Sequence, residues 1–365
     1  MKILYLITSW DFGGAEMQVL ALAETMQKQS HKVLVVSMIK PNTDFLLKSK
    51  GITVKTLSMS KGFPDARAIF RFKKILKNYK PNVVHAHMIH AVLLGRISRI
   101  FIKIPRLIST AHNINEGGKI RELMYRYTDF LSDTNTNVSQ SGLDLYLKKG
   151  IFKKESNSFF IPNGIFLPNS NDTTKNKNSL RKSLGVNKET FLFLAIGRLE
   201  AAKDYQNLFE ATKILLTKTT TFKILIAGEG TLRKPLEQSL QELKLSNNIT
   251  LLGRRNDIPN LLQAADAFIM SSAWEGLPIA ILEAASYGMP MLVTDVGGCK
   301  EAVENNKNGF VVPPKNSNEL ANAMLNIMQV SDIKINEMRA YSLAKIKNNY
   351  EMGIIIQKWL TLYQG

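Results

Sequence analysis

The feature that most constrains the fold of this chain is an alternation of short apolar runs and amphipathic stretches, which occurs twice. The apolar runs are rich in β-branched residues and bounded by turn-forming residues, which predicts strands. Segments such as 15–29, 64–79, 91–103 and 119–131 repeat apolar residues at helical spacing. Strands alternating with helices predict parallel sheets covered on both faces. The predicted strands are KILYLIT, KVLVVSM, ITVKTLS, NVVHAH, RLISTAH, TNTNVS and SFFIPNG in the first half, and FLFLAIG, FKILIAG, ITLLG, AFIMSS, MLVTD and GFVVP in the second.

A polar stretch, LPNSNDTTKNKNS, separates the two halves and has the composition of a linker. The chain has 365 residues, which is long for one core and suits two domains. The pattern therefore predicts an α/β protein with two Rossmann-like domains. We expect an N-terminal domain over 1–166, a linker over 167–180 and a C-terminal domain over 181–345. The last segment, 346–365, reads as a C-terminal helix, for which packing back on the N-terminal domain is one arrangement.

Cysteine content and hydropathy bear on the compartment. Cys299 is the single cysteine, so no disulfide can form within the chain, and a reducing compartment fits best. The N-terminus reads as a first strand rather than a signal peptide, because Asp11 and two glycines follow its apolar run. No stretch approaches the roughly 18 uninterrupted apolar residues of a spanning helix. We expect a cytoplasmic protein that can still associate with the inner face of the cytoplasmic membrane.

The net charge of +18 is concentrated in the first half, where residues 1–170 hold 25 Lys and Arg against 11 Asp and Glu. One explanation is codon bias, since lysine and asparagine are both abundant. The other is an anionic partner, either a membrane face or a polyanionic acceptor. Residues 65–80 and 95–106 mix cations with apolar residues, as in helices that lie on anionic membranes. Helices that pack on a sheet and expose lysine give the same pattern, so both interpretations stay open.

Two carboxylates in WEGLPIAILEAASYG point to a binding site. Glu275 lies in the expected loop after a strand, and Glu283 lies in the helix that Pro278 begins. Ionised carboxylates only accept hydrogen bonds, and polyols offer many paired donors. The pair is therefore consistent with contacts to sugar or ribose hydroxyls, whereas spacing alone favours acids near a helix N-terminus or on the surface.

Neighbouring strand ends add the groups that bind a diphosphate. Arg198 and Lys203 follow a strand and precede a helix. Gly297 and Gly298 form another strand-to-helix turn, where backbone N–H groups can approach an anion. Cations, amides and carboxylates at three successive strand ends together predict a site for a nucleotide diphosphate-sugar.

These motifs, in series over residues 190–313, resemble those of the retaining family 4 glycosyltransferases of GT-B fold. The resemblance rests on Glu275-x7-Glu283 together with GRLEAAKD, GEGTLRKPLE, LLGRRNDIPNLLQAADAFIMSS and TDVGGCKEAVENNKNGFVVPP. It implies two Rossmann-like domains that face each other across a cleft. It also implies transfer of a hexose, with retention, from a nucleotide diphosphate-sugar, most often UDP-linked, to a saccharide or lipid-linked saccharide. The expected pathway is surface polysaccharide synthesis, such as capsule, O-antigen, lipooligosaccharide or exopolysaccharide.

The resemblance also implies roles for individual residues. Arg198 and Lys203 would bind the donor diphosphate, and Glu275 with the amide of Gly276 would hold hydroxyls of the transferred sugar. Glu283 would hold the ribose, and Glu301 would support the site. Asp204 stands where glycine is frequent in the family, and Cys299-Lys300 stand where apolar or proline residues are common.

The N-terminal half contributes further candidates. Gly13 and Gly14 in SWDFGGAEMQ match the family's glycine loop, although an ordinary strand-to-helix turn fits each alone. His112 in STAHN matches a family histidine near the transferred sugar, and it completes a catalytic set with Glu275, Arg198 and Lys203. The remaining histidines of VVHAHMIHA are expected to contact the cleft or acceptor rather than a metal, because no acid accompanies them. They are His85, His87 and His90.

The sequence predicts that no metal or cofactor is required. No Asp-x-Asp follows a predicted strand, so the leaving diphosphate would be stabilised by Arg198, Lys203 and helix N-termini. A nucleotide-sugar epimerase of the same fold is an alternative. A non-enzymatic polyanion-binding protein is another, whereas nucleic acid is not an expected partner because no recognised motif accompanies the basic stretches.

Overall fold

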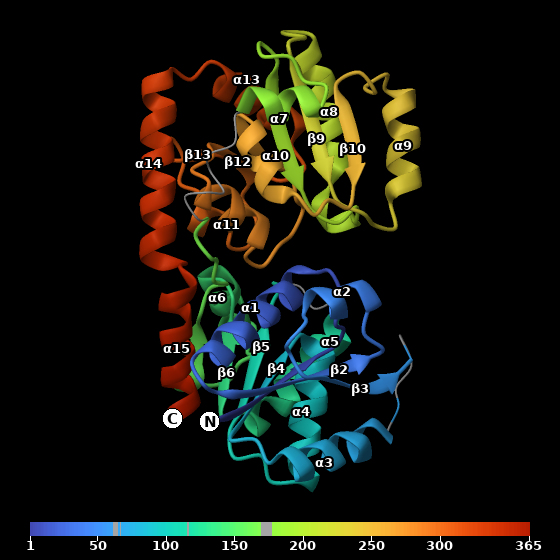
Figure 1. The fold of residues 1–365 in the computed structure, drawn as a ribbon, viewed down its shortest axis with the longest axis vertical. Coiled ribbons are helices and arrows are strands. Elements are labelled where there is room, and N and C mark those ends of the chain that lie inside the picture. The colour runs from blue at the N-terminus through green and yellow to red at the C-terminus, as the bar shows by residue number, and fades with distance from the viewer. Residues whose placement is uncertain (61–64, 66, 115–116, 169–176) are drawn as a thin grey trace. The chain divides into compact units, whose positions relative to one another are not determined.

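The computed structural model describes residues 1–60, 65, 67–114, 117–168 and 177–365. The chain forms two compact units (Figure 1). Unit 1 comprises Met1–Gly164 and Met352–Gly365, and unit 2 comprises Ile165–Glu351. Most of the predicted linker, residues 169–176, lies outside the described residues.

Unit 1 is built on a parallel sheet of seven strands in the order β3-β2-β1-β4-β5-β6-β7. All seven strands predicted for the first half are present. They are β1 (Lys2–Ile7), β2 (Lys32–Ile39), β3 (Val54–Met59), β4 (Val83–His87), β5 (Leu107–Ala111), β6 (Thr134–Asn137) and β7 (Ser158–Phe160).

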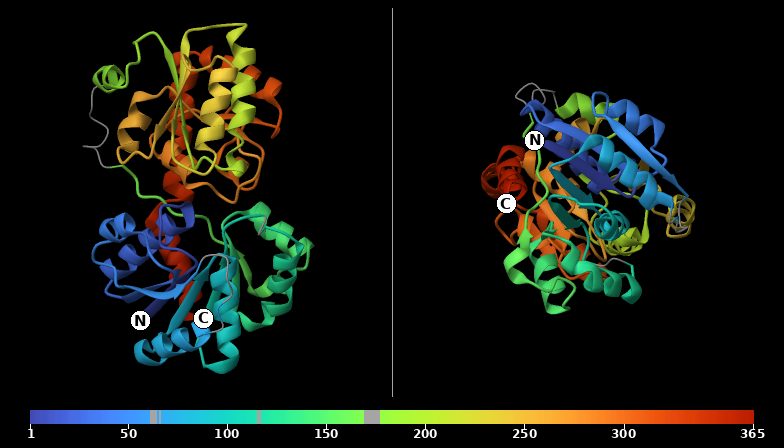
Figure 2. Two further views of the ribbon diagram at one scale, coloured as in Figure 1. Left: turned by 90° about the vertical axis from the view of Figure 1, so that its right-hand side faces the viewer. Right: turned by 90° about the horizontal axis from the view of Figure 1, so that it is seen from below.

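Helices cover both faces of this sheet, because alternate strand residues point to opposite sides. Leu4 and Leu6 pack in one apolar cluster with α3 and α4, whereas Ile3, Tyr5 and Ile7 pack in another with α1 and α15. Figures 1 and 2 show the C-terminal helix α15 lying along the other elements of unit 1. The helices of the unit are α1 (Gly14–Lys28), α2 (Thr43–Lys48), α3 (Arg67–Tyr79), α4 (Ile89–Phe101), α5 (Lys119–Thr128), η1 (Asp129–Leu131), α6 (Gln140–Lys148), η2 (Glu155–Asn157) and α15 (Met352–Gln364).

Unit 2 repeats the design with six parallel strands in the order β10-β9-β8-β11-β12-β13. Its strands match the six predicted apolar runs. They are β8 (Phe191–Ile196), β9 (Phe222–Ala227), β10 (Ile249–Gly253), β11 (Ala267–Met270), β12 (Met291–Thr294) and β13 (Gly309–Val312).

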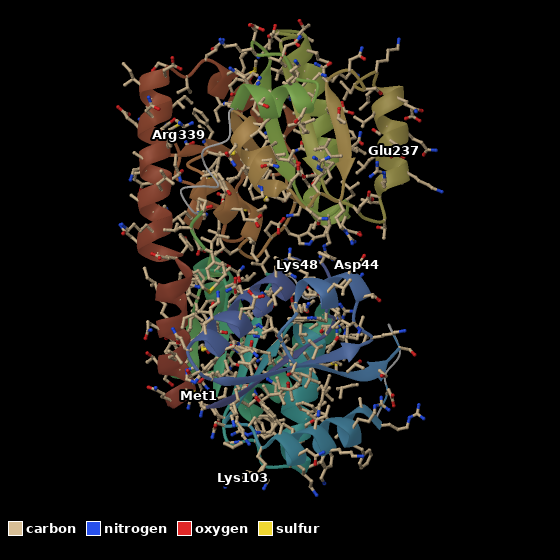
Figure 3. All side chains as sticks on the ribbon, in the orientation of Figure 1. Met1, Asp44, Lys48, Lys103, Glu237 and Arg339 are labelled. Carbon is tan, nitrogen blue, oxygen red and sulfur yellow. The ribbon has the colours of Figure 1, made fainter. Side chains whose placement is uncertain are left out.

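The helices of unit 2 bury their apolar faces against this sheet. α14 and α9 lie toward opposite edges of the unit, where Figure 3 labels Arg339 and Glu237. The elements are α7 (Lys177–Ser183), η4 (Ala201–Lys203), α8 (Tyr205–Leu216), α9 (Arg233–Glu242), α10 (Ile258–Ala264), α11 (Ile279–Ser286), α12 (Cys299–Ala302), α13 (Ser317–Met328) and α14 (Asp332–Asn349).

The C-terminal segment differs from its prediction. The segment 346–365, predicted as one C-terminal helix, is divided between the end of α14 in unit 2 and α15 in unit 1. The break falls at Tyr350 and Glu351, where Glu351 forms an isolated parallel bridge with Ile165. The boundary between units therefore lies at 351/352 rather than at 345/346.

Candidate functional site

The candidate donor site lies where the strand order of unit 2 reverses. β8 and β11 are neighbours, yet the chain runs from β8 outward through β9 and β10 before it returns to β11. Loops at the carboxyl ends of such strands diverge and form the usual ligand site of an open parallel sheet. Lys203 lies in η4 after β8, and Glu275 lies in the loop after β11. The fold therefore brings these two residues together although 72 positions separate them.

Lys203 and Glu275 form a largely buried ion pair. The Lys203 Nζ atom lies 2.6 Å from Oε1 of Glu275, and the two side chains are only 16% and 13% exposed. The Ser272 hydroxyl donates to the same carboxylate oxygen at 2.8 Å. Within the described part of the chain, Oε2 of Glu275 makes no hydrogen bond, and Lys203 Nζ bonds only to Glu275. An ammonium has three N–H groups, so the pair retains one acceptor and two donors for a ligand.

Hydrogen bonds to backbone groups also join the loops that carry Lys203 and Glu275. The Ser271 hydroxyl donates to the carbonyl oxygens of Lys203 and Asp204, at 3.0 and 3.1 Å. The amide of Ala273 donates to the carbonyl of Ala202 at 2.8 Å. The loop after β8 and the loop after β11 are thus joined independently of the ion pair.

The double glycine fixes the loop that carries Glu275. Gly297 adopts a φ of +52°, and a Cβ atom there would lie 2.2 Å from the carbonyl oxygen of Glu275. The amide of Gly298 donates to the carbonyl of Gly276. The Gly298 N–H, expected to face an anion, is therefore occupied, whereas those of Gly297 and Gly276 make no hydrogen bond within the described residues.

Arg198 provides an exposed cation at the same edge. It follows β8, its side chain is exposed, and it forms no ion pair with the residues that the structure describes. The backbone around it is tightly packed, because a Cβ at Gly228 would lie 1.9 Å from the Gly197 carbonyl oxygen and one at Gly230 would lie 2.3 Å from that of Leu199. Because Gly228 and Gly230 have no side chain, the loop after β9 can pack directly against the backbone on both sides of Arg198.

The other carboxylates lie on short helices beside this loop. Glu283 is the fifth residue of α11, which begins at Ile279 after Pro278, and its side chain is half-buried. Glu301 lies in α12, directly after the double glycine, and its carbonyl accepts a hydrogen bond from the Tyr350 hydroxyl at 3.1 Å. The structure thus places both on elements adjoining the Glu275 loop.

Two buried residues of the site escape a motif-based prediction. The Tyr205 hydroxyl donates to the Gly197 carbonyl at 3.2 Å, and burial, reinforced by the Glu275 charge, raises the Tyr205 pKa. Burial also raises the pKa of the Cys299 thiol, and Glu275 acts in the same direction. Both side chains are therefore neutral around pH 7. Tyr205 directly follows LEAAKD in the sequence, and this position is the signal from which its place in the site could have been predicted.

In unit 1, Gly13 and Gly14 form the turn from β1 into α1. Gly13 caps the helix in an extended conformation, and Gly14 is the first helical residue. A Cβ atom at Gly13 would lie 2.4 Å from Oε2 of Glu16, whose other oxygen accepts from the Ser9 hydroxyl at 2.5 Å. The glycine thus leaves room for a carboxylate in the first turn.

His112 is held by a second histidine that sequence reasoning did not connect to it. Its Nε2 atom lies 2.9 Å from Nδ1 of His87, because β4 and β5 are neighbours and both residues stand at strand ends. Burial lowers the pKa of His112 to about 4 and that of His87 well below its usual value. Both rings are neutral near pH 7, so one ring donates an N–H to the unprotonated nitrogen of the other.

The expectation that His85 contacts the cleft or acceptor is wrong. His85 is fully buried, with Nδ1 2.7 Å from the Tyr363 hydroxyl of α15 and Nε2 2.6 Å from the Thr110 hydroxyl. Both ring nitrogens are therefore used inside unit 1. His90 lies on the exposed side of α4.

The two basic stretches bury many of their apolar residues against the sheet, although Phe70, Ile100 and Phe101 are exposed. In α3, Ala68, Phe72 and Leu76 are buried, and most apolar residues of α4 are buried as well. This arrangement explains their pattern without a membrane. The helix with the most exposed apolar side is instead α5, which was predicted as a helix but not connected with a partner.

The described residues include no group of three or more His, Cys, Asp and Glu side chains arranged to hold a metal ion. In that same part of the chain, no helix is long and apolar enough to cross a membrane.

Two family models match the chain. "Glycosyltransferase Family 4" matches residues 12–167, and "Glycosyl transferases group 1" matches residues 176–343. The chain is 28% identical over 335 residues to UDP-Gal:alpha-D-GlcNAc-diphosphoundecaprenol alpha-1,3-galactosyltransferase from Escherichia coli, covering 88% of this chain and 86% of the relative. It is 26% identical over 361 residues to N,N'-diacetylbacillosaminyl-diphospho-undecaprenol alpha-1,3-N-acetylgalactosaminyltransferase from Campylobacter jejuni, covering 90% of both.

The fold is shared with solved structures. The crystal structure of Anabaena HepE in complex with UDP and glucose superposes with a TM-score of 0.86, at 23% identity and over the full length of both chains. The Escherichia coli and Campylobacter jejuni relatives are both named as transferases. With matched family models over both halves, and with two Rossmann-like units of this topology, the chain belongs to the family 4 glycosyltransferases of GT-B fold.

Proposed function

We propose that this glycosyltransferase transfers a hexose from a UDP-sugar to a lipid-linked saccharide, with retention of anomeric configuration and without a metal, in surface polysaccharide assembly. The names of the Escherichia coli and Campylobacter jejuni relatives specify diphosphoundecaprenol-linked saccharides, and the former also specifies UDP-galactose. The HepE structure contains UDP and glucose. These support the donor and acceptor classes.

The observation that carries the proposal is the Lys203–Glu275 pair at the strand-order reversal of unit 2. Its unfilled ammonium N–H groups suit a diphosphate oxygen, and the unfilled Oε2 suits a sugar hydroxyl. A sugar attached directly to a diphosphate could bond both groups at once. Arg198, exposed at the same edge, supplies a further cation for the phosphates.

The remaining contacts follow from the neighbouring elements. Glu283 on α11 is assigned to the ribose hydroxyls, and the amides of Gly276 and Gly297 are assigned to the sugar and diphosphate. Glu301 supports this loop from α12. Because Gly298 already donates to Gly276, its role is to hold the loop rather than to bind the donor.

Unit 1 is assigned to the acceptor side of the reaction. His112 would contact the transferred sugar through its Nδ1 atom, because Nε2 is engaged with His87. Gly13 and Gly14, which form the turn from β1 into α1, are assigned to phosphate or acceptor oxygens.

Retention is proposed to proceed on one face of the sugar. The bond between the anomeric carbon and the leaving phosphate oxygen breaks, and a bond from that carbon to the acceptor oxygen forms on the same side. The acceptor proton passes to the departing phosphate oxygen. A double displacement needs a carboxylate beneath the ring, but Glu275 is already bound through Oε1 to Lys203 and Ser272.

Metal independence follows from the charges assigned to the site. Arg198 and Lys203 would stabilise the negative charge that develops on the leaving diphosphate, as preorganised electrostatic groups do. No step of the proposed transfer is routed through a divalent cation.

The test is calorimetric titration of the full chain with UDP, GDP and ADP in EDTA, on the native protein and on Glu283→Ala. We expect UDP to bind selectively and the variant to bind it about tenfold more weakly, since hydrogen bonds to a charged group contribute about 1.5–3 kcal/mol. Glu242→Ala is the matched control, because Glu242 is an exposed carboxylate at the end of α9.

Each alternative outcome removes part of the proposal. Binding that requires added magnesium would refute metal independence. Equal affinity for the three nucleotides would refute the UDP preference, and unchanged affinity in Glu283→Ala would refute the ribose contact. Anomeric configuration is read separately, from the NMR coupling constant of the product's new glycosidic proton.

A further inference from the structure

Helix α5 turns its apolar side away from the core of unit 1. Ile120, Leu123, Met124 and Tyr127 are 76%, 46%, 43% and 68% exposed. Their spacing of three, one and three residues places them on one side of the helix. Tyr125 is the buried residue of α5. Helices that pack on a sheet normally expose their charged side, so α5 has the reverse orientation.

The inward side of α5 is fixed by specific contacts, so the orientation is not that of a loosely attached helix. The Tyr125 ring packs against Tyr146 and Phe152, with centroids 6.1 and 6.4 Å away. The buried guanidinium of Arg96 lies 4.9 Å from the centre of the Tyr125 ring, and its Nη1 donates to the Tyr125 carbonyl at 2.9 Å. These contacts hold α5 against α4 through its one buried aromatic residue.

The apolar surface continues into η1, where Phe130 is 73% exposed. We call Ile120, Leu123, Met124, Tyr127 and Phe130 the α5 face.

The charges around the α5 face are predominantly positive. Lys119, Arg121 and Arg126 are exposed on α5. The two acids of this segment are paired with cations from elsewhere: Glu122 lies 2.7 Å from Lys149, and buried Asp129 lies 3.7 Å from Arg96. An apolar stripe with a basic rim is the composition of helices that lie in the interface of an anionic membrane.

We propose that the α5 face docks this glycosyltransferase on an anionic lipid bilayer. The inference deepens the proposed function, since a lipid-linked acceptor is presented at such a surface. α5 begins seven residues after His112 in the chain, and the Tyr146 hydroxyl that donates to the Asn113 carbonyl lies in the same aromatic cluster as Tyr125. A bilayer beneath α5 would therefore hold the acceptor's lipid anchor near the loop of His112.

Charge distinguishes the bilayer from a second copy of this chain. A symmetric dimer through the α5 face would bring two identical basic rims together, which costs energy. Anionic headgroups neutralise that rim while the apolar stripe enters the acyl region.

The experiment measures co-sedimentation of the full chain with vesicles of phosphatidylethanolamine and phosphatidylglycerol, compared with phosphatidylcholine alone. We expect binding to the anionic vesicles at 0.1 M salt and its loss at high salt. Ile120→Asp should weaken binding at least tenfold, because it removes a large apolar group from the buried side. Arg126→Glu should weaken it by about fivefold or more, from the loss of one cation near the surface. Ile333→Asp on α14 is the matched control, since Ile333 is 75% exposed in unit 2.

A fluorescence measurement reports insertion directly. In a Trp274→Phe background, the remaining tryptophans, Trp10 and Trp359, are buried. Brominated lipids should then quench a tryptophan introduced by Tyr127→Trp but not one introduced by Ile333→Trp. The circular dichroism spectrum and unfolding temperature of each variant check that it is folded.

Three outcomes would overturn the proposal. They are failure of the native protein to bind anionic vesicles, binding that Ile120→Asp and Ile333→Asp reduce equally, and a dimer without lipid that Ile120→Asp dissociates. Vesicle binding requires no donor or catalysis, so these outcomes are independent of the UDP titration.

Discussion

Three histidines of unit 1, the buried His85 and His87 and the half-buried His112, predict a steep loss of stability between pH 7 and pH 5. Burial lowers the pKa of His85, His87 and His112 below the value of about 6.5 expected in the unfolded chain, to about 4 for His112. In this window the unfolded state binds protons that the folded state does not. Acidification therefore favours unfolding, and the stability recovers as the pH rises above 6.5.

The magnitude follows from proton linkage. A histidine that is neutral when folded and has a pKa of 6.5 when unfolded loses about 2 kcal/mol of stability from pH 7 to pH 5. Three such residues give an upper figure of about 6 kcal/mol. With a urea dependence of about 2 kcal/mol per molar, each histidine corresponds to a midpoint shift of about 1 M. His31 and His90 have pKa values lowered in the same direction, but both are less buried and contribute less.

Tryptophan fluorescence can report on unit 1 alone. The chain has three tryptophans, of which Trp10 and Trp359 are buried in unit 1 and Trp274 lies in unit 2. In Trp274→Phe, urea unfolding followed by fluorescence at pH 7, 6 and 5 thus measures the unit that contains the histidines.

A variant separates the histidine contribution from other titrations. His112→Asn should reduce the stability difference between pH 7 and pH 5 by about 2 kcal/mol, whatever its effect at pH 7. His90→Asn, at an exposed position, should reduce it by less. Midpoints that do not change between pH 7 and pH 5, or equal changes in both variants, would refute the assignment of buried neutral histidines.

Two further predictions concern unit 2. Gly297→Ala should destabilise unit 2 by more than the roughly 1–2 kcal/mol that an alanine at positive φ costs, because its Cβ would also meet the Glu275 carbonyl oxygen. The control is Gly185→Ala, at φ +65° with open space around it, which should cost only that conformational energy. Equal urea midpoints for the two variants would contradict the steric argument. Cys299 is buried, and burial raises the pKa of its thiol. A thiol-specific disulfide reagent should therefore react with Cys299 in urea but not in the folded protein. Rapid labelling of the native chain would show that the loop around Cys299 opens.

The sequence predicts the sheets well because parallel strands buried on both faces leave a strong signal. Each predicted apolar run corresponds to a strand, from KILYLIT at β1 to GFVVP at β13. Helical periodicity is less informative about where a helix belongs. Residues 334–363 have helical spacing throughout, yet Tyr350 and Glu351 interrupt the helix, and the parts before and after them pack on different units. The contacts that divide it are tertiary and are not encoded in the periodicity.

The candidate site was predictable as a set of loops but not as a set of contacts. The rule that ligands bind after parallel strands led to Lys203 and Glu275, but their ion pair requires β8 and β11 to be neighbours. The bond between His87 and His112 likewise depends on the pairing of β4 with β5. The outward orientation of α5 depends on Tyr125 and could not be distinguished from an ordinary amphipathic helix by spacing.

Under the proposed function, the Lys203–Glu275 pair would serve both the folded structure and the binding of the donor. A buried charge without its partner is costly, so each residue protects the other before a donor arrives. The pair has no net charge, however, and cannot by itself attract a diphosphate. We propose that this attraction comes from Arg198, because it is exposed and makes no ion pair with the described residues. Because Ser271 and Gly298 join the loops through separate hydrogen bonds, Lys203 can turn part of its bonding toward a phosphate without releasing Glu275. In the proposed donor site, these hydrogen bonds would hold the two loops in place without a ligand, and Arg198 would supply the positive potential at a small desolvation cost because it is exposed.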